Sequence, residues 1–355
     1  MRQNKFSSLD TPSVIVDLDV AKANIERFQT YCDQHGMKLR PHIKTHKLPG
    51  LAHYQIEKGA IGITCQKVSE AEAMISDGGI SDVLITYNIL GEAKTKRLRA
   101  LADRVMVRVV ADNSDVVKGL SLAFADASRS LPILVECNTG ANRCGVASPA
   151  LARDLAIEID DLPGLSFAGL MTYPPVGAAA HVHDWLRNAK ALIEGSGLSV
   201  HIISSGGSPD MWKAHEMPLA TEYRIGTYVY NDRSLVMRGT CGWEDCALTV
   251  LATVVSVPSA NHAVIDAGSK VLTSDLLGLD GHGHVLGRDD LKIDQLSEEH
   301  GRIWCEGAIN LAVGDRLRIV PNHACVVANM LDHVELVQGN TVLASTPVAA
   351  RGQVW

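Results

Sequence analysis

Short apolar runs alternate with longer amphipathic stretches over the first two thirds of the chain. This alternation is typical of successive βα units, and strands that are apolar throughout indicate a parallel sheet covered on both faces. The eight predicted strands are Val14–Asp17, Lys38–Ile43, Ile61–Cys65, Val83–Tyr87, Val105–Val110, Ile133–Cys137, Phe167–Thr172 and Val200–Ser204. Such a series favours a TIM barrel over a dinucleotide-binding sheet, because no GxGxxG sequence follows the first strand.

The pattern changes at about residue 234. Apolar runs after this point are separated by Gly, Asn and Asp turns, which is typical of a β domain. The strands predicted there are Leu248–Val257, His262–Asp266, Arg316–Val320, His333–Val337 and Thr341–Thr346, and the glycine-rich segment Leu277–Gly287 is expected to form a long loop. The sequence thus predicts an α/β TIM barrel over residues 10–233 and a C-terminal β domain over residues 234–355, and it leaves residues 1–9 open to join the β domain.

Composition and charge argue against nucleic-acid and membrane partners. The 355 residues are 46% hydrophobic and carry a net charge of -7, which gives no support to a nucleic-acid surface. No apolar run approaches the roughly 20 residues of a membrane helix, and the polar start MRQNKFSSLD lacks the apolar core of a secretion signal. The eight cysteines form no CxxC pair, so a disulfide framework is not expected. These observations predict a cytoplasmic protein without nucleic-acid or membrane partners.

A basic segment, RPHIKTHK at residues 40–47, follows the second predicted strand. The chemistry of a TIM barrel gathers at the carboxyl ends of its strands, which is where Lys44 falls. The positive neighbours Arg40 and Lys47 favour the neutral, nucleophilic form of its amine. We predict that Lys44 holds pyridoxal phosphate (PLP) as a Schiff base, although the segment taken alone is more typical of a solvated basic turn.

The segment SSGGS at residues 204–208 follows the last predicted strand of the barrel. Glycines let the backbone approach an anion closely, and hydroxyl and N–H groups supply hydrogen bonds to phosphate oxygens. A flexible turn is the alternative for such a string. Its position after a barrel strand favours a phosphate site, which Gly226 and Thr227 would close from the other side.

A second chemical centre is predicted in the β domain, at His323 and Cys325. Imidazole and thiolate together suit Zn²⁺, and two protein ligands leave positions open for substrate and water, as a catalytic metal site requires. The spacing alone would also describe a buried thiol beside a polar histidine.

Seven segments carry a resemblance to a known family. In chain order they are RPHIKTHK, GITCQKVSEAEAM, NTGANRCGV, SSGGS, IGTYVYND, VIDAGSK and PNHAC. Together they resemble the D-threonine aldolase and D-serine dehydratase family, and the similarity runs from about Asp10 to the C-terminus. The resemblance implies the alanine-racemase-like fold, with a PLP-binding barrel and a C-terminal β domain. It also implies a homodimer in which the β domain of one subunit completes the active site of the other.

The resemblance implies roles for individual residues. Lys44 resembles the Schiff-base lysine, and His323 and Cys325 resemble the ligands of a metal, with Zn²⁺ favoured over Mn²⁺ or Mg²⁺. Arg224 corresponds to an arginine that faces the pyridine nitrogen in alanine racemases, which would leave that nitrogen unprotonated and weaken the electron sink. The remaining cofactor residues implied are Gln66, Arg143 and Tyr173 around the ring, and Ser205, Gly206, Gly207, Gly226 and Thr227 at the phosphate.

The implied activity is that of a PLP- and divalent-metal-dependent lyase acting on 3-hydroxy-D-amino acids. Retro-aldol cleavage to glycine and an aldehyde ranks first, and dehydration to a 2-oxo acid and ammonia and amino-acid racemisation are the alternatives. Aldolases of the family carry a histidine six residues after the active-site tyrosine, where this chain has Ala179. His181 is therefore the candidate base, beside Lys44 and Tyr173 as catalytic residues, whereas Cys325 is typical of the dehydratases.

Overall fold

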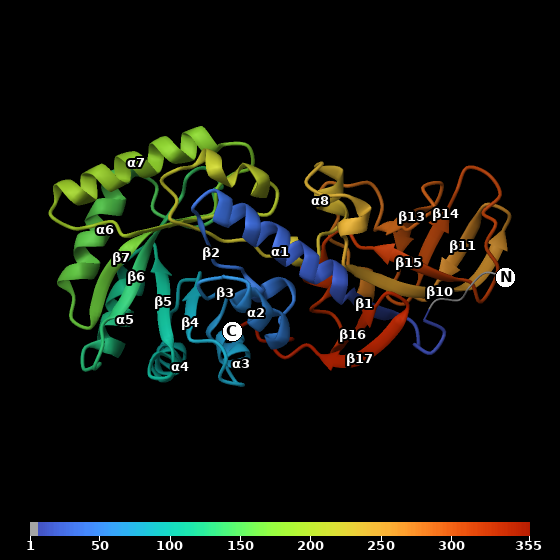
Figure 1. Cartoon of the computed structure of the whole chain (residues 1–355), viewed down its shortest axis with the longest axis horizontal. Helices are drawn as coiled ribbons and strands as arrows, with labels where there is room; N and C mark the ends of the chain where they lie inside the picture. Colours follow the sequence, from blue (N-terminus) through green and yellow to red (C-terminus); the bar gives the residue numbers. More distant parts are fainter. Residues whose placement is uncertain (1–5) are drawn as a thin grey trace. The chain divides into compact units, whose positions relative to one another are not determined.

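A computed structural model describes residues 6–355, which divide into two units (Figure 1). We call them the barrel unit and the β unit. The barrel unit comprises Phe28–Lys44, Pro49–Gly226 and Gly352–Trp355, and the β unit comprises the chain up to Arg27, Thr45–Leu48 and Thr227–Arg351. The chain therefore leaves the barrel unit directly after Lys44 and again directly after Gly226.

An eight-stranded parallel sheet forms the barrel unit, in the order β2-β9-β8-β7-β6-β5-β4-β3. Its strands are β2 (Lys38–Leu39), β3 (Ile63–Cys65), β4 (Asp82–Ile85), β5 (Met106–Ala111), β6 (Leu131–Cys137), β7 (Leu165–Thr172), β8 (Ile202–Ser205) and β9 (Glu222–Tyr223). A parallel bridge between His42 and Thr64 joins the two ends of this order, and the Thr64 N–H donates to the Pro41 carbonyl at 2.7 Å. The sheet closes in this way, which confirms the predicted barrel.

Helices cover the outer side of the barrel sheet (Figure 1). The helices that belong wholly to the barrel unit are α2 (Pro49–Glu57), α3 (Val68–Met74), α4 (Glu92–Ala102), α5 (Ser114–Phe124), α6 (Pro149–Asp161) and α7 (Ala179–Gly195). Helix α1 (Leu18–Gln34) begins in the β unit and enters the barrel unit at Phe28. Asn113 and Ser148 cap α5 and α6 by accepting backbone N–H groups of the first turn. Apolar helix residues such as Leu120 pack with strand residues such as Val109 in one buried cluster, whose burial provides the main stabilisation of this layer.

One predicted barrel strand is wrong. The segment Val14–Asp17 lies in β1 (Ser13–Asp17), which pairs antiparallel with β10 (Leu248–Ser259) and parallel with β16 (His333–Gln338) in the other unit. The central residues of β1 are buried, so this strand shows the same uninterrupted apolar run as a barrel strand. The eighth barrel strand is β9, which the sequence does not reveal because it is only two residues long and contains Glu222.

The β unit contains a nine-stranded, mostly antiparallel sheet, in the order β13-β14-β11-β10-β1-β16-β17, with β15 on β10 and β12 on β15. Its further strands are β11 (His262–Ile265), β12 (His284–Val285), β13 (Lys292–Leu296), β14 (Gly301–Trp304), β15 (Arg316–Val320) and β17 (Thr341–Pro347), and its short helices are α8 (Arg233–Met237), α9 (Ser269–Leu272) and α10 (Ala324–Val327). The predicted β domain is therefore confirmed. Three strands, β12 to β14, escape prediction because they are short and mix polar with apolar residues, and β12 lies inside the expected loop Leu277–Gly287.

Neither a membrane-spanning helix nor a disulfide occurs among the residues that the structure describes. Over residues 6–355, no helix combines the length and the apolar composition needed to span a membrane. None of the eight cysteines forms a disulfide in this part of the chain.

Arg40 and Glu222 form an ion pair inside the barrel, with 3.0 Å between Nε and Oε2 and both side chains almost fully buried. We expect Arg40→Met to lower the free energy of unfolding by about 3–5 kcal/mol, because it leaves a buried carboxylate without its charge partner. Urea denaturation would measure this loss. Lys96→Met is the control, since its ion pair with Glu92 is exposed on α4 and its removal is expected to change little. Equal stabilities of the two variants would contradict the expectation.

Candidate functional site

The predicted cofactor residues of the barrel unit lie at the carboxyl ends of its strands. Lys44 follows β2, Gln66 follows β3, Arg143 follows β6, Tyr173 follows β7, Ser205 ends β8 and Arg224 follows β9. Because the strands are parallel, these ends meet on one face of the barrel, which is the face that carries chemistry in TIM barrels. The fold thus brings together residues that are separated by up to 180 positions in the sequence.

Lys44 lies in a 3₁₀ turn (Ile43–Thr45), and its side chain is exposed. Its backbone N–H donates to Nδ1 of the buried His42 at 3.3 Å, and Nε2 of His42 lies 3.1 Å from Oε1 of Gln66. Burial, and then the positive charge of Lys44, hold the pKa of His42 well below its usual range, so the ring is neutral. His42 must therefore accept at Nδ1 and donate from Nε2. It connects the turn of Lys44 to Gln66, whose amide in turn donates to the Thr86 carbonyl at 2.9 Å.

His42 is a site residue that sequence reasoning missed. It lies in the basic segment, but nothing in the segment shows that its ring would be buried and neutral. The sequence does contain one local signal, because a histidine two residues before Lys44 is placed to accept the Lys44 backbone N–H.

The segment after β8 has the features of a phosphate cradle. The Oγ atom of Ser205 is buried and has no hydrogen-bond partner among the described residues. Gly206 has a φ of +149°, and a Cβ atom there would lie 2.0 Å from the Arg224 carbonyl oxygen, so only glycine is tolerated. The Tyr223 hydroxyl donates to the carbonyl of Gly207 at 2.8 Å and fixes the next peptide. An unsatisfied buried hydroxyl beside two glycines fits an anionic ligand such as a phosphate group.

The other two residues predicted at the phosphate fall on either side of a unit boundary. Gly226 is buried and ends a segment of the barrel unit, where the His42 N–H donates to the Ile225 carbonyl at 2.7 Å. Thr227 begins the next segment of the β unit, and its hydroxyl lies 3.4 Å from the sulfur of Cys325.

Arg143 and Tyr173 contact each other at the same end of the barrel. The guanidinium carbon of Arg143 lies 4.6 Å from the centre of the Tyr173 ring, which is a cation–π contact. Its Nη2 lies 4.0 Å from the buried carboxylate of Glu136. Burial raises the pKa of Glu136, and the charges of Arg143 and Arg224 oppose that shift. Gly207 approaches the same tyrosine ring from the phosphate cradle.

His181, the candidate base, lies in the first turn of α7 and is exposed. The loop between Tyr173 and this helix is held by a hydrogen bond of 2.6 Å from the Gly177 N–H to the Asp210 carboxylate. The base role of His181 stays a prediction.

The predicted metal ligands lie together in the β unit, after β15. His323 precedes α10 and Cys325 is its second residue. Nδ1 of His323 lies 2.9 Å from Oδ2 of Asp232, and the Cys325 sulfur lies 2.9 Å from the Thr45 hydroxyl. Burial alone would lower the pKa of His323, but hydrogen bonds to Asp232 and Cys325 and their negative charges raise it to about 10.

Asp232 is the second site residue that sequence reasoning missed. Its carboxylate is fully buried and, besides His323, accepts the backbone N–H of Ala324 at 3.0 Å and that of Leu235 at 3.1 Å, with which it caps α8. It therefore fixes the ring of His323 and leaves Nε2 as the nitrogen for a metal, which is the usual arrangement of a carboxylate behind a histidine ligand. An N-cap aspartate can be read from sequence, but its pairing with a histidine 91 positions away cannot.

The donor set of this pair fits a divalent metal. One imidazole and one thiolate are ligands that Zn²⁺ prefers. Within residues 6–355, no cluster of three or more His, Cys, Asp and Glu side chains has the spacing of a complete metal site. The pair thus fits an open site, in which water or substrate supplies the remaining ligands.

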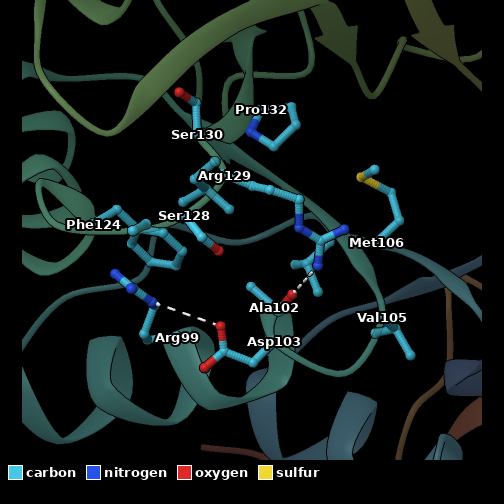
Figure 2. A pocket seen from close by; sticks show the side chains of 13 residues that line it. Arg99, Ala102, Asp103, Val105, Met106, Phe124, Ser128, Arg129, Ser130 and Pro132 are labelled. Carbon is cyan, nitrogen blue, oxygen red and sulfur yellow. Dashed lines mark hydrogen bonds and ion pairs between the residues drawn. The ribbon is translucent and has the colours of Figure 1, made fainter.

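A separate cavity of about 60 Å³ lies at the opposite end of the barrel (Figure 2). It is bordered by α4, α5 and the beginnings of β5 and β6, and Arg129 donates to the Ala102 carbonyl at 2.8 Å beside it. Arg99 and Asp103 face each other across 3.8 Å at its edge. Residues at the amino-terminal ends of barrel strands serve stability rather than chemistry, so this cavity is not a candidate active site.

Comparison with known proteins covers both units. Residues 16–234 match the family model described as "Alanine racemase, N-terminal domain", which is more than half of the chain. Residues 247–337 match the model described as "Putative serine dehydratase domain".

Individual relatives are similar over nearly the whole length. A D-threonine aldolase of Arthrobacter sp. is 33% identical, with 98% of this chain and 94% of the relative covered. A 3-hydroxy-D-aspartate aldolase of Paracoccus denitrificans is 32% identical, with 98% and 93% covered.

Solved structures give the same result. The crystal structure of a D-threonine aldolase from Filomicrobium marinum has a TM-score of 0.92 at 33% identity and covers 99% of this chain and 98% of that one. A D-threo-3-hydroxyaspartate dehydratase from Delftia sp. has a TM-score of 0.86 at 27% identity, with 97% and 99% covered. Two variants of a dehydratase of this name, with alanine in place of a histidine and of a cysteine two positions apart, were also solved, the second in the metal-free form.

The barrel unit, the β unit and these similarities together show the family of the chain. It belongs to the D-threonine aldolase and D-serine dehydratase family of alanine-racemase-like lyases.

Proposed function

We propose that this protein is a PLP- and metal-dependent lyase that cleaves 3-hydroxy-D-amino acids to glycine and an aldehyde. The observation that carries the proposal is the joint occurrence of Lys44 with a phosphate cradle and of a His–Cys pair, in a chain that is 33% identical to a D-threonine aldolase over 98% of its length. Two relatives are named for different 3-hydroxy-D-amino acids, D-threonine and 3-hydroxy-D-aspartate. They support this class of substrate without selecting one substrate side chain.

The cofactor would be held by residues of the barrel unit. Ser205, Gly206 and Gly207 would bind its phosphate, since the Ser205 hydroxyl is buried without a hydrogen-bond partner and the two glycines add no side chain beside it. Lys44 would anchor its aldehyde, and the neutral His42 would fix the turn from which that lysine extends. The contact of Arg143 with Tyr173 would shield the cofactor ring from water.

The metal would be held by His323 and Cys325 in the β unit. Zn²⁺ is favoured over Mn²⁺ or Mg²⁺ because one ligand is a thiolate. The solved variants of the related dehydratase support the assignment, since they change a histidine and a cysteine with the spacing of His323 and Cys325, and the cysteine variant is described as metal-free.

The chemistry divides between bound groups and protein side chains. When bound, PLP would accept the electrons released at the substrate Cα and the metal would polarise the 3-hydroxyl group. For cleavage, a base must remove the hydroxyl proton, and His181 is our candidate. For dehydration, Nζ of Lys44 would instead take the proton from Cα.

Dehydration to a 2-oxo acid and ammonia is the second candidate. Cys325 favours it, because the related dehydratase was altered at a cysteine in the same spacing. Ala179 favours it as well, because aldolases resembling this chain place a histidine there. A homodimer with shared active sites and a cytoplasmic location are further proposals that rest on the family resemblance.

Product identification separates the two reactions. We expect that the protein, supplied with PLP and Zn²⁺ or Mn²⁺, converts D-threonine to glycine and acetaldehyde and leaves L-threonine unchanged. D-Serine is tested in parallel for release of ammonia. A 2-oxo acid as the main product would establish the dehydratase instead, and formation of L-allo-threonine from D-threonine, by inversion at Cα alone, would indicate a racemase.

A further inference from the structure

A continuous network of buried and partly buried polar side chains crosses the interior of the barrel. Arg108 donates to Asp82 at 2.8 Å, and Arg40 donates both to Asp82 and to Glu222. Glu222 accepts the hydroxyl hydrogen of Ser204 at 2.6 Å, and Ser204 accepts from Nε of Arg224 at 2.8 Å. Its last three members, Glu222, Ser204 and Arg224, are 3%, 0% and 6% exposed, so water contributes little to their orientation.

The Ser204 hydroxyl can take only one orientation in this network. A carboxylate only accepts hydrogen bonds and a guanidinium only donates them. Ser204 must therefore give its hydrogen to Glu222 and offer a lone pair to Arg224. Ser204 and Glu222 are register partners on adjacent parallel strands, so the sheet itself holds the distance between them.

Arg224 is fixed through two different nitrogen atoms. Nε donates to Ser204, and Nη2 donates to the Thr172 carbonyl at the end of β7. Two contacts at separate nitrogens define the plane of a guanidinium group, which one contact would leave free to turn. Burial lowers the pKa of Arg224 to about 10, and the charge of Glu222 opposes this shift, so the group stays charged.

We propose that Ser204 and Glu222 are positioning residues that hold the guanidinium of Arg224 in one orientation at the carboxyl end of the barrel. The orientation follows from the hydrogen bonds alone. Its consequence for the cofactor rests on the proposed function and on the family resemblance, which implies that Arg224 faces the ring nitrogen of PLP and leaves it unprotonated.

The orientation is tested without cofactor. We expect solvent exchange of the Arg224 Nε–H, followed by NMR in arginine-labelled protein and assigned with Arg224→Lys, to be about tenfold or more faster in Ser204→Ala than in the wild type. Ser204→Thr restores the hydroxyl and is expected to restore slow exchange. Ser121→Ala is the matched control, because it also removes a buried serine hydroxyl bond, to the Pro163 carbonyl, outside the network. Equal exchange in Ser204→Ala and the wild type would overturn the proposal.

Glu222→Gln is the second variant, which serves if Ser204→Ala does not fold. A glutamine keeps the shape of the side chain but can both donate and accept, so the hydroxyl orientation is no longer forced. We expect faster Nε–H exchange here as well, and a rate equal to that of the wild type would count against the role of Glu222.

The consequence for the cofactor has a separate readout. In the PLP-loaded protein without substrate, we expect the pH dependence of the visible absorbance to shift in Ser204→Ala and to stay unchanged in Ser121→Ala. An unchanged profile in Ser204→Ala would overturn the link to the cofactor. A wild-type protein that shows no visible band with PLP would instead count against the proposed function. It would leave the proposed orientation of Arg224 untouched, because the exchange measurement needs no cofactor.

Discussion

Lys44→Ala is expected to show no visible absorbance band after incubation with PLP and to lose turnover of D-threonine by at least about 10²- to 10⁴-fold, the range of a missing acid–base group. The physical reason is that Lys44 is the amine that follows β2 at the carboxyl end of the barrel, on the face that also carries the phosphate cradle. The barrel strands do not depend on its side chain, which is exposed. Absorbance after removal of free PLP and a coupled acetaldehyde assay measure the two effects.

Lys38→Ala is the matched control for this variant. Lys38 is also exposed and also belongs to the β2 region, but it lies at the amino-terminal end of that strand. We expect it to keep the visible band and the wild-type rate. A Lys44→Ala protein that stays yellow would refute the choice of anchor, and so would a Lys38→Ala protein that turns colourless while Lys44→Ala keeps its band. Loss of the band in both variants would point to a general defect in folding, which circular dichroism would detect.

Much of the fold can be predicted from the apolar pattern alone, because seven of the barrel strands are short runs bounded by turn residues. The apolar pattern does not distinguish two strands whose surroundings are equally buried. Both β1 and a barrel strand are covered on two faces, so Val14–Asp17 carries no sign of the sheet it joins. It also fails where the interior of the barrel is polar, since Glu222 in β9 faces the Arg40 network rather than an apolar core.

The candidate site also has a part that the sequence predicts and a part that it does not. Lys44, Gln66, Tyr173 and Ser205 can be predicted because parallel strands deliver their carboxyl ends to one face, and position along the chain is then enough. Partners cannot be predicted so readily, because they come together only through the tertiary structure. The bond between Asp232 and His323 and the unsatisfied hydroxyl of Ser205 both depend on which segments the fold places side by side.

Cys325→Ala is expected to lose bound metal and lyase activity and to keep the visible band of PLP, since the predicted cofactor residues Lys44 and Ser205 are not changed. The loss of metal affinity should exceed the roughly 10- to 100-fold that removal of an outer partner costs, because one of only two predicted protein ligands is removed. Atomic absorption after dialysis measures the metal, and activity is titrated with added Zn²⁺. Full activity of the wild type in the presence of a strong chelator would contradict a metal role.

Two further variants define what the thiol contributes. Cys305→Ala removes another buried thiol of the β unit, whose S–H donates to the Gly307 carbonyl at 3.0 Å. This variant should keep metal and activity. Asp232→Asn keeps the shape behind His323 but weakens the hold on Nδ1, so we expect metal affinity to fall by about 10- to 100-fold and excess Zn²⁺ to restore activity. Rescue by Zn²⁺ in Asp232→Asn but not in Cys325→Ala would separate a residue that orients a ligand from one that is a ligand. If excess metal restored both equally, Cys325 would be an orienting residue too, and the open site would have to be built on His323 alone.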